Sequence, residues 1–255
     1  MNRKIQFAPG EFYHVYNRGN DKRVIFIDKM DYERFISLLF FCNSYVKVDM
    51  KSIKKLFSEG DTFADFIGWR GKTLVDIGAF CLMPNHFHLL IHEKENNGIT
   101  TFIKKVGTAY SMYFNLKYKR KGKLFEGVFC ATHADNDRYL KHLFTYIHLN
   151  PLKLSDPNWK ENGVEDMEDA CTRLSEYPYS SLRTYQGKNV SDAVIINPDP
   201  FPEYFLEKDM EASIKEWFLS KSKFGEGDTF TKVGITSFFG FLLLYNQIMD
   251  LAIFS

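Results

Sequence analysis

The fold is decided by the stretch Cys81-Leu82-Met83-Pro84-Asn85-His86-Phe87-His88-Leu89-Leu90-Ile91. A Pro-Asn turn signal stands between two apolar runs, residues 73–82 before it and residues 86–92 after it. Apolar runs of this length joined by a tight turn are typical of a β-hairpin. The stretch therefore predicts two antiparallel strands, with a pair of histidines at the start of the second.

The histidine pair is the sharpest chemical feature of the chain. Residues at positions i and i+2 of a strand face the same side, so His86 and His88 are expected side by side, with Phe87 turned into the core. Two adjacent neutral imidazoles can ligate one divalent metal and leave room for a further ligand. The motif is short and also arises by chance, so two ordinary strand histidines are the alternative.

Further elements are predicted on both sides of the hairpin. Strands are expected at residues 11–17 and 124–132, and helices at residues 31–44, 100–119 and 135–149. Asp135 or Asn136 is the expected N-cap of the last helix, and Pro151 prevents its continuation beyond Asn150. This order predicts an α+β fold, a mainly antiparallel sheet with helices packed on it.

Composition sets broad limits. The chain has 255 residues, 45% of them hydrophobic, which is enough apolar surface for a substantial core and excludes a disordered protein. The net charge is only +1, but residues 101–130 hold seven basic residues against the single acid Glu126. Such a stripe fits a nucleic-acid groove or, with similar weight, a solvated helix face. The four cysteines are far apart and indicate neither a zinc site nor a disulfide framework.

The two ends of the chain indicate its compartment. The first residues lack a secretory signal pattern, so a cytoplasmic location is expected. Residues 235–254 are apolar, but Asn246, Gln247 and Asp250 interrupt them, which favours a buried or partner-facing helix over a membrane span. Residues 203–219 are also expected to be helical, and residues 46–72 are interpreted as an insertion.

The segment from Cys81 to Ile91 resembles the metal-site signature of the single-tyrosine HUH transposases, in particular the REP-associated tyrosine transposases and their IS200-like insertion-sequence relatives. Other segments resemble this family in the same order: residues 12–20, 113–127, 146–151 and 179–181. The resemblance covers about residues 11–185. It implies a ferredoxin-like or RRM-like HUH nuclease core at residues 1–186, followed by a helical C-terminal extension at residues 187–255.

The resemblance also implies roles for individual residues. The family's catalytic tyrosine falls on Tyr146, and its third metal ligand, an amide one turn later, falls on Asn150. These two residues are four apart and therefore share a helix face. An amide oxygen beside two imidazoles suits Mg²⁺ or Mn²⁺. Tyr139, on the same predicted helix, is the second candidate for the nucleophile.

The implied function is cleavage and rejoining of single-stranded DNA through a 5′-phosphotyrosine, in DNA transposition or REP-element mobilisation. The implied partner is single-stranded DNA with a hairpin, bound by a monomer or homodimer without a membrane. Candidate DNA contacts are Arg18, Lys104, Lys105, Lys117, Lys119, Arg120 and Lys123. Two alternatives stay open: a catalytically silent hairpin-binding protein, and a metalloenzyme that acts on another substrate.

The chain departs from the family pattern at two places. Val128 stands where the family usually has a basic residue after its Phe-x-Gly segment, so one DNA contact is in doubt. The insertion at residues 46–72 is longer than the family needs. The remaining histidines, His14, His133, His142 and His148, have no spacing that indicates a site and are interpreted as structural.

Overall fold

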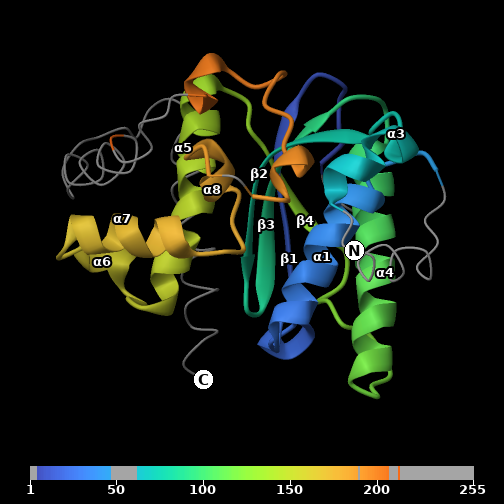
Figure 1. Ribbon diagram of the computed structural model, residues 1–255, viewed down its shortest axis with the longest axis horizontal. Coiled ribbons are helices and arrows are strands. Elements are labelled where there is room, and N and C mark those ends of the chain that lie inside the picture. The colour runs from blue at the N-terminus through green and yellow to red at the C-terminus, as the bar shows by residue number, and fades with distance from the viewer. Residues whose placement is uncertain (1–4, 47–61, 189, 207–211, 213–255) are drawn as a thin grey trace. The chain divides into compact units, whose positions relative to one another are not determined.

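The centre of the computed structural model is a four-stranded antiparallel sheet with the strand order β2-β3-β1-β4 (Figure 1). The structure describes residues 5–46, 62–188, 190–206 and 212. The strands are β1 (Phe12–Arg18), β2 (Val75–Met83), β3 (His86–Glu93) and β4 (Cys130–His133). Met83 pairs with His86 across the Pro-Asn turn, so the predicted hairpin is confirmed.

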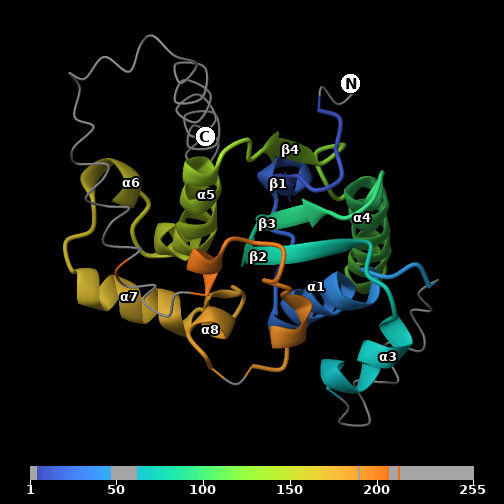
Figure 2. The same ribbon diagram turned by 90° about the horizontal axis from the view of Figure 1, so that it is seen from above.

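Helices cover both faces of this sheet, which confirms the predicted α+β class. On one face lie α1 (Lys29–Phe41) and α4 (Gly98–Lys117), which contact each other. On the opposite face lies α5 (Asp137–Leu149), which contacts β2 and β3 (Figures 1 and 2). The sheet therefore separates the helix that carries Tyr146 from the helix that carries much of the basic stripe.

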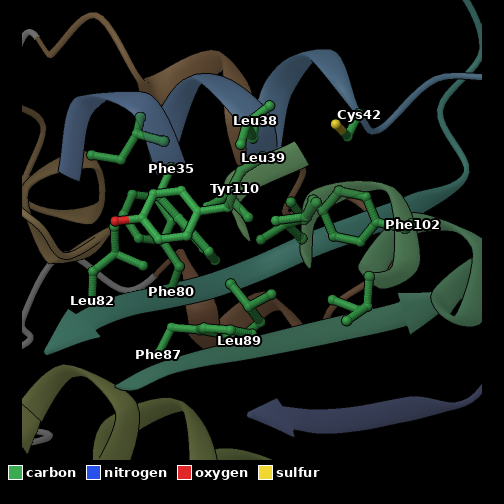
Figure 3. Close-up of a cluster of buried hydrophobic side chains, with 14 of the residues drawn as sticks. Phe35, Leu38, Leu39, Cys42, Phe80, Leu82, Phe87, Leu89, Phe102 and Tyr110 are labelled. Carbon is green, nitrogen blue, oxygen red and sulfur yellow. The ribbon is translucent and has the colours of Figure 1, made fainter. Parts of the chain in front are cut away.

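The main core lies between the sheet and the α1–α4 pair. Alternate residues of β3 point toward it, as Figure 3 shows for Phe87 and Leu89 below the α4 residue Tyr110. The rings of Phe87 and Phe35 have centroids 4.9 Å apart. Full burial of such a side chain stabilises the fold by about 1.5–3 kcal/mol. Because Phe87 is anchored here, the side chains of His86 and His88 must face the other way, toward α5.

Local sequence signals explain where the helices begin. The Asp28 side chain accepts the amide hydrogen of Asp31, while the Asp31 carboxylate accepts that of Asp28, which is a capping box at the start of α1. At α5 the side chain of Asn136 accepts the amide hydrogen of Tyr139 at 2.8 Å. Asn136 is therefore the N-cap, one of the two residues predicted for it.

The strand predicted at residues 124–132 is shorter than expected. Only Cys130–His133 pairs with β1, while Phe125 forms an isolated bridge with Gly19 beyond the end of β1. Gly127 lies between them with φ of 103°, a conformation that favours glycine and turns the chain. The predicted strand is thus divided by a glycine turn.

Short elements complete the described chain. They are η1 (Asn20–Lys22), η2 (Phe63–Phe66), α3 (Ile67–Arg70), η3 (Asn150–Leu154), α6 (Trp159–Asn162), α7 (Met167–Glu176), α8 (Leu182–Tyr185), η4 (Ala193–Ile195) and η5 (Glu203–Phe205). Between α7 and α8, the chain runs along the edge of β2, where Ser180 bridges Cys81. Further along, Ile196 bridges Ile77, and Phe205 stacks on Phe144 of α5 with ring centroids 4.0 Å apart.

Some sequence predictions fall beyond the described residues. The expected helix at 203–219 begins as the turn η5, and of the residues after Leu206 only Ala212 is described. The expected helix at 235–254, most of the extension at 187–255 and most of the insertion at 46–72 lie outside the described residues. In the part of the chain that the structure describes, no helix has the length and apolar character needed to cross a membrane.

Candidate active site

The predicted histidine pair lies buried between β3 and α5. His86 and His88 are 8% and 1% exposed, and their rings have centroids 4.9 Å apart. Imidazole–metal bonds are about 2.1 Å long, so two rings at this separation can share one ion. The same-face geometry predicted for the pair is therefore present.

Burial keeps both rings neutral. Burial, together with the positive charges of Lys153, Lys160 and Arg18, lowers the pKa of His86 to about 3. Burial also holds the pKa of His88 well below its usual value of 6.5. Neutral imidazole offers a nitrogen lone pair, which is the form that binds metal ions. The two rings therefore have the protonation state that a metal site requires.

Each histidine has a hydrogen-bond partner that orients it. The Nδ1 of His86 lies 2.6 Å from the side-chain oxygen of Asn85, which can only accept, so this nitrogen donates and the Nε2 keeps its lone pair. The Nδ1 of His88 lies 2.8 Å from the Nε2 of His14, a buried histidine of β1. Partners of this kind fix the tautomer of a ligating imidazole.

Tyr146 of α5 lies directly against this pair. Its ring centroid is 5.8 Å from that of His88 and 6.2 Å from that of His14, and both contacts are edge-to-face. The ammonium group of Lys160, on α6, lies 3.4 Å from the Tyr146 hydroxyl. The predicted nucleophile therefore lies against the predicted histidine pair.

Asn150 follows Tyr146 by one helical turn and is buried at the end of α5. Its Nδ2 donates to the backbone oxygens of Tyr146, at 2.9 Å, and of Ile147, at 3.5 Å. These bonds engage the nitrogen of the amide, so the carbonyl oxygen is the atom that would serve as a ligand.

Tyr139 lies in the first turn of α5 and is also buried. Burial raises the pKa of its phenol, and the nearby Tyr16, Asp135 and Tyr146 raise it further. A raised pKa disfavours the phenolate that attacks a phosphate. Together with the ring contact between Tyr146 and His88, this favours Tyr146 as the nucleophile.

The predicted DNA contacts are divided between two regions. Arg18 pairs with His86 in the β1–β3 ladder and forms an ion pair with Glu126, so it lies beside the histidines. The other six candidates, on α4 and the loop after it, are attached to the opposite face of the sheet: Lys104, Lys105, Lys117, Lys119, Arg120 and Lys123. The structure does not bring these six together with the histidines.

Three of those six have structural partners within the fold. Arg120 donates to the Oδ1 of Asn115 at 3.3 Å. Lys117 lies 2.7 Å from carboxylate oxygens of both Asp28 and the fully buried Asp31. Lys105 donates to the backbone oxygens of Ser44 and Val46. Lys104, Lys119 and Lys123 are exposed, as is Val128. Part of the basic stripe therefore stabilises α1 and its C-terminal end.

Within the described ranges, no three His, Cys, Asp or Glu side chains are grouped so as to hold a metal ion. His14 does not add a third imidazole, because its Nε2 is directed at the Nδ1 of His88. Two imidazoles together with an amide oxygen would suit Mg²⁺ or Mn²⁺ once phosphate or water oxygens complete the shell.

Two residues of the site were missed from the sequence. His14 was interpreted as structural, because its contact with His88 depends on the pairing of β1 with β3, which the sequence does not specify. Lys160 was assigned no role, because it stands in an acidic, polar segment without periodicity. No local pattern indicates either contact.

One family of known proteins matches part of this chain. Residues 66–150 match the family model described as "Transposase IS200 like", so the resemblance stated from the sequence is confirmed over these residues. The matched residues include His86, His88 and Tyr146, and the match ends at Asn150. It does not include His14, on β1, or Lys160, on α6.

No curated protein matches the chain. Among solved structures, it is similar to the "Structure of the REP associates tyrosine transposase bound to a REP hairpin", with 15% sequence identity and a TM-score of 0.43. That similarity covers 75% of this chain and 89% of the other.

Proposed function

We propose that this chain, which matches the IS200-like transposases over residues 66–150, cleaves and rejoins single-stranded DNA through a covalent bond to Tyr146. The observation that carries the proposal is the contact between the Tyr146 ring and the buried, neutral His88, with Asn150 one turn later on α5. A nucleophile beside neutral imidazoles and an amide is an arrangement suited to phosphoryl transfer.

In the proposed reaction the Tyr146 oxygen attacks the phosphorus of a DNA phosphodiester. A bond forms between that oxygen and phosphorus, and the bond from phosphorus to the 3′-oxygen breaks, which leaves a 5′-phosphotyrosine and a free 3′-hydroxyl. A second 3′-hydroxyl then attacks the phosphotyrosine and releases Tyr146. Each step exchanges one phosphate ester for another, so rejoining needs no nucleotide cofactor.

We assign His86, His88 and Asn150 as the residues that would hold a divalent cation, Mg²⁺ or Mn²⁺. The fit rests on the separation of the two rings, on their neutral state and on the uncommitted oxygen of the amide. When bound, such a cation neutralises charge that develops on the phosphate oxygens. Asn85 and His14 then act as orienting partners of the two imidazoles.

We further propose that the substrate is single-stranded DNA with a hairpin, as the resemblance to the REP-associated tyrosine transposases implies. Arg18 would contact the backbone near the cleaved phosphate, because its strand partner is His86. The exposed lysines after α4, such as Lys119 and Lys123, would contact DNA farther from the reaction. A monomer and a homodimer are both compatible with this arrangement.

The test is an adduct assay. Wild-type protein is incubated with hairpin-bearing single-stranded DNA and Mn²⁺, and the denatured mixture is examined for protein bound covalently to labelled DNA. We expect an adduct that Tyr146→Phe abolishes and Tyr139→Phe retains. Loss in Tyr139→Phe alone would move the nucleophile to that residue. Hairpin binding without an adduct at any metal concentration would instead indicate the silent hairpin-binding protein, and no DNA binding would refute both.

A further inference from the structure

Lys160 lies outside the residues that match the transposase family, yet the fold places it at the reacting atom. Pro151 ends α5 just after Asn150, and the chain turns through η3 into the short helix α6. The first residue of α6, Trp159, is fully buried and anchors it. The next residue is Lys160, so its backbone position is fixed by the packing of its neighbour.

Two measurements locate the ammonium group of Lys160. Its Nζ lies 3.4 Å from the Tyr146 hydroxyl oxygen and 4.9 Å from the centre of the Tyr146 ring. The positive charge of Lys160 also contributes to the lowered pKa values of His86, His88 and His142. Lys160 is therefore within reach both of Tyr146 and of the place where a phosphate would lie.

The described contacts of the Tyr146 side chain come from two imidazoles and one cation. His14 and His88, on β1 and β3, are neutral because burial lowers their pKa values. Farther out the charged groups are of both signs: Arg18 and Lys153 are cations, Glu126 pairs with Arg18, and Asp135 lies near Tyr139. Lys160 is therefore the positive charge that directly faces negative charge developing at the tyrosine oxygen.

We propose that Lys160 is a catalytic residue whose ammonium group donates a hydrogen bond to the Tyr146 oxygen and stabilises it as a phenolate in both directions of the reaction. This inference rests on the proposed function, because it needs Tyr146 to be the nucleophile. In cleavage the phenol proton passes to water, the tyrosine oxygen bonds to phosphorus, and the departing 3′-oxygen takes a proton from water. In rejoining the tyrosine oxygen departs as the phenolate. Lys160 keeps its own proton throughout.

Lys160→Met removes the charge and keeps a side chain of similar length. At saturating DNA we expect the single-turnover rates of cleavage and of rejoining to fall about 30-fold each. Loss of one well-aligned electrostatic donor lowers a catalytic rate about 10²–10³-fold. We expect a smaller effect here because the contact is long, at 3.4 Å.

A modified substrate distinguishes an action of the Lys160 charge on the Tyr146 oxygen from an action on the departing 3′-oxygen. Replacing the departing 3′-oxygen by sulfur makes departure easy without stabilisation by the protein. If Lys160 acts on the Tyr146 oxygen, Lys160→Met stays impaired with this substrate. If the impairment disappears, the lysine acts on the departing group and the proposal is wrong.

Two further variants serve as controls. Lys160→Arg keeps a positive donor and should recover most of the rate. Lys141→Met removes a lysine of α5 that also lies over a tyrosine ring, that of Tyr204, and should leave both rates unchanged. Equal thermal unfolding of the variants checks that α6 is intact.

The outcomes are distinct. A Lys160→Met protein with wild-type rates of cleavage and rejoining would overturn the role of Lys160 and leave the proposed function standing. The same holds if only DNA affinity falls while the saturated rate is unchanged. A wild-type protein that forms no adduct with DNA would overturn the proposed function itself.

Discussion

The hydrogen bond between His14 and His88 permits a quantitative test of the proposed metal site. Its nitrogens are 2.8 Å apart, and His14 and His88 are 5% and 1% exposed. His14→Leu removes one partner and leaves the Nδ1 of His88 buried without one, which costs about 1–3 kcal/mol of unfolding free energy. It also frees the His88 tautomer, and loss of such an orienting partner lowers metal affinity about 10–100-fold.

Two measurements are needed. Urea unfolding in EDTA gives the change in stability, and titration calorimetry with Mn²⁺ gives the change in metal affinity. His14→Gln is the conservative variant, because its amide oxygen can still accept from His88 Nδ1, so we expect it to recover part of the affinity. His133→Leu is the matched control: His133 lies on the neighbouring strand β4 and bonds to Glu11, away from the histidine pair.

A His14→Leu protein that binds Mn²⁺ as tightly as wild type, while His88→Ala does not bind it, would refute the orienting role of His14. That result would show that His88 is a ligand whose orientation does not depend on β1. A similar loss in His133→Leu would show that the assay reports general disturbance of the sheet.

Three further predictions concern the fold. The metal-free protein should lose stability as the pH falls from about 6.5 toward 3, because burial lowers the pKa to about 3 for His14, His86 and His148. Each histidine that is neutral in the fold should lower the free energy of unfolding by about 1.4 kcal/mol per pH unit. Circular dichroism against pH checks this, and stability unchanged down to pH 4 contradicts it. Lys117→Ala should lower the unfolding free energy by about 1–3 kcal/mol, because a buried carboxylate on α1 loses its cation. Lys104 is exposed, so Lys104→Ala should change the unfolding free energy by less than about 0.5 kcal/mol. Equal urea midpoints for the two variants would refute the structural role of Lys117. Gly78→Ala should destabilise by about 1–3 kcal/mol, because a methyl group there overlaps the ring of Phe201; a neutral change by thermal unfolding would mean that this ring does not pack on β2.

The local features of this protein could be predicted from its sequence. The alternation of His86, Phe87 and His88 followed from strand geometry, and the turn at Pro84 and Asn85 fixed the hairpin. The extent of α5 followed from its N-cap and from Pro151. Each of these signals acts over a few residues, which is why a single sequence carries it.

Contacts between distant segments could not be predicted. His14 meets His88 across 74 residues, and the pairing register that brings them together is set by the whole sheet. Lys117 looked like a DNA contact because its acidic partners, Asp28 and Asp31, lie almost 90 residues earlier. The predicted strand before Cys130 failed for a local reason, the positive φ of Gly127, which hydrophobic periodicity does not register.

The central claim is that the Tyr146 oxygen becomes bonded to DNA phosphorus. The most direct measurement is to isolate the wild-type adduct, digest the protein and the DNA, and locate the attached nucleotide by mass spectrometry. We predict a phosphotyrosine at Tyr146, in the α5 peptide that ends beside Asn150. A nucleotide found on Tyr139 or on any other residue would contradict this account of the site.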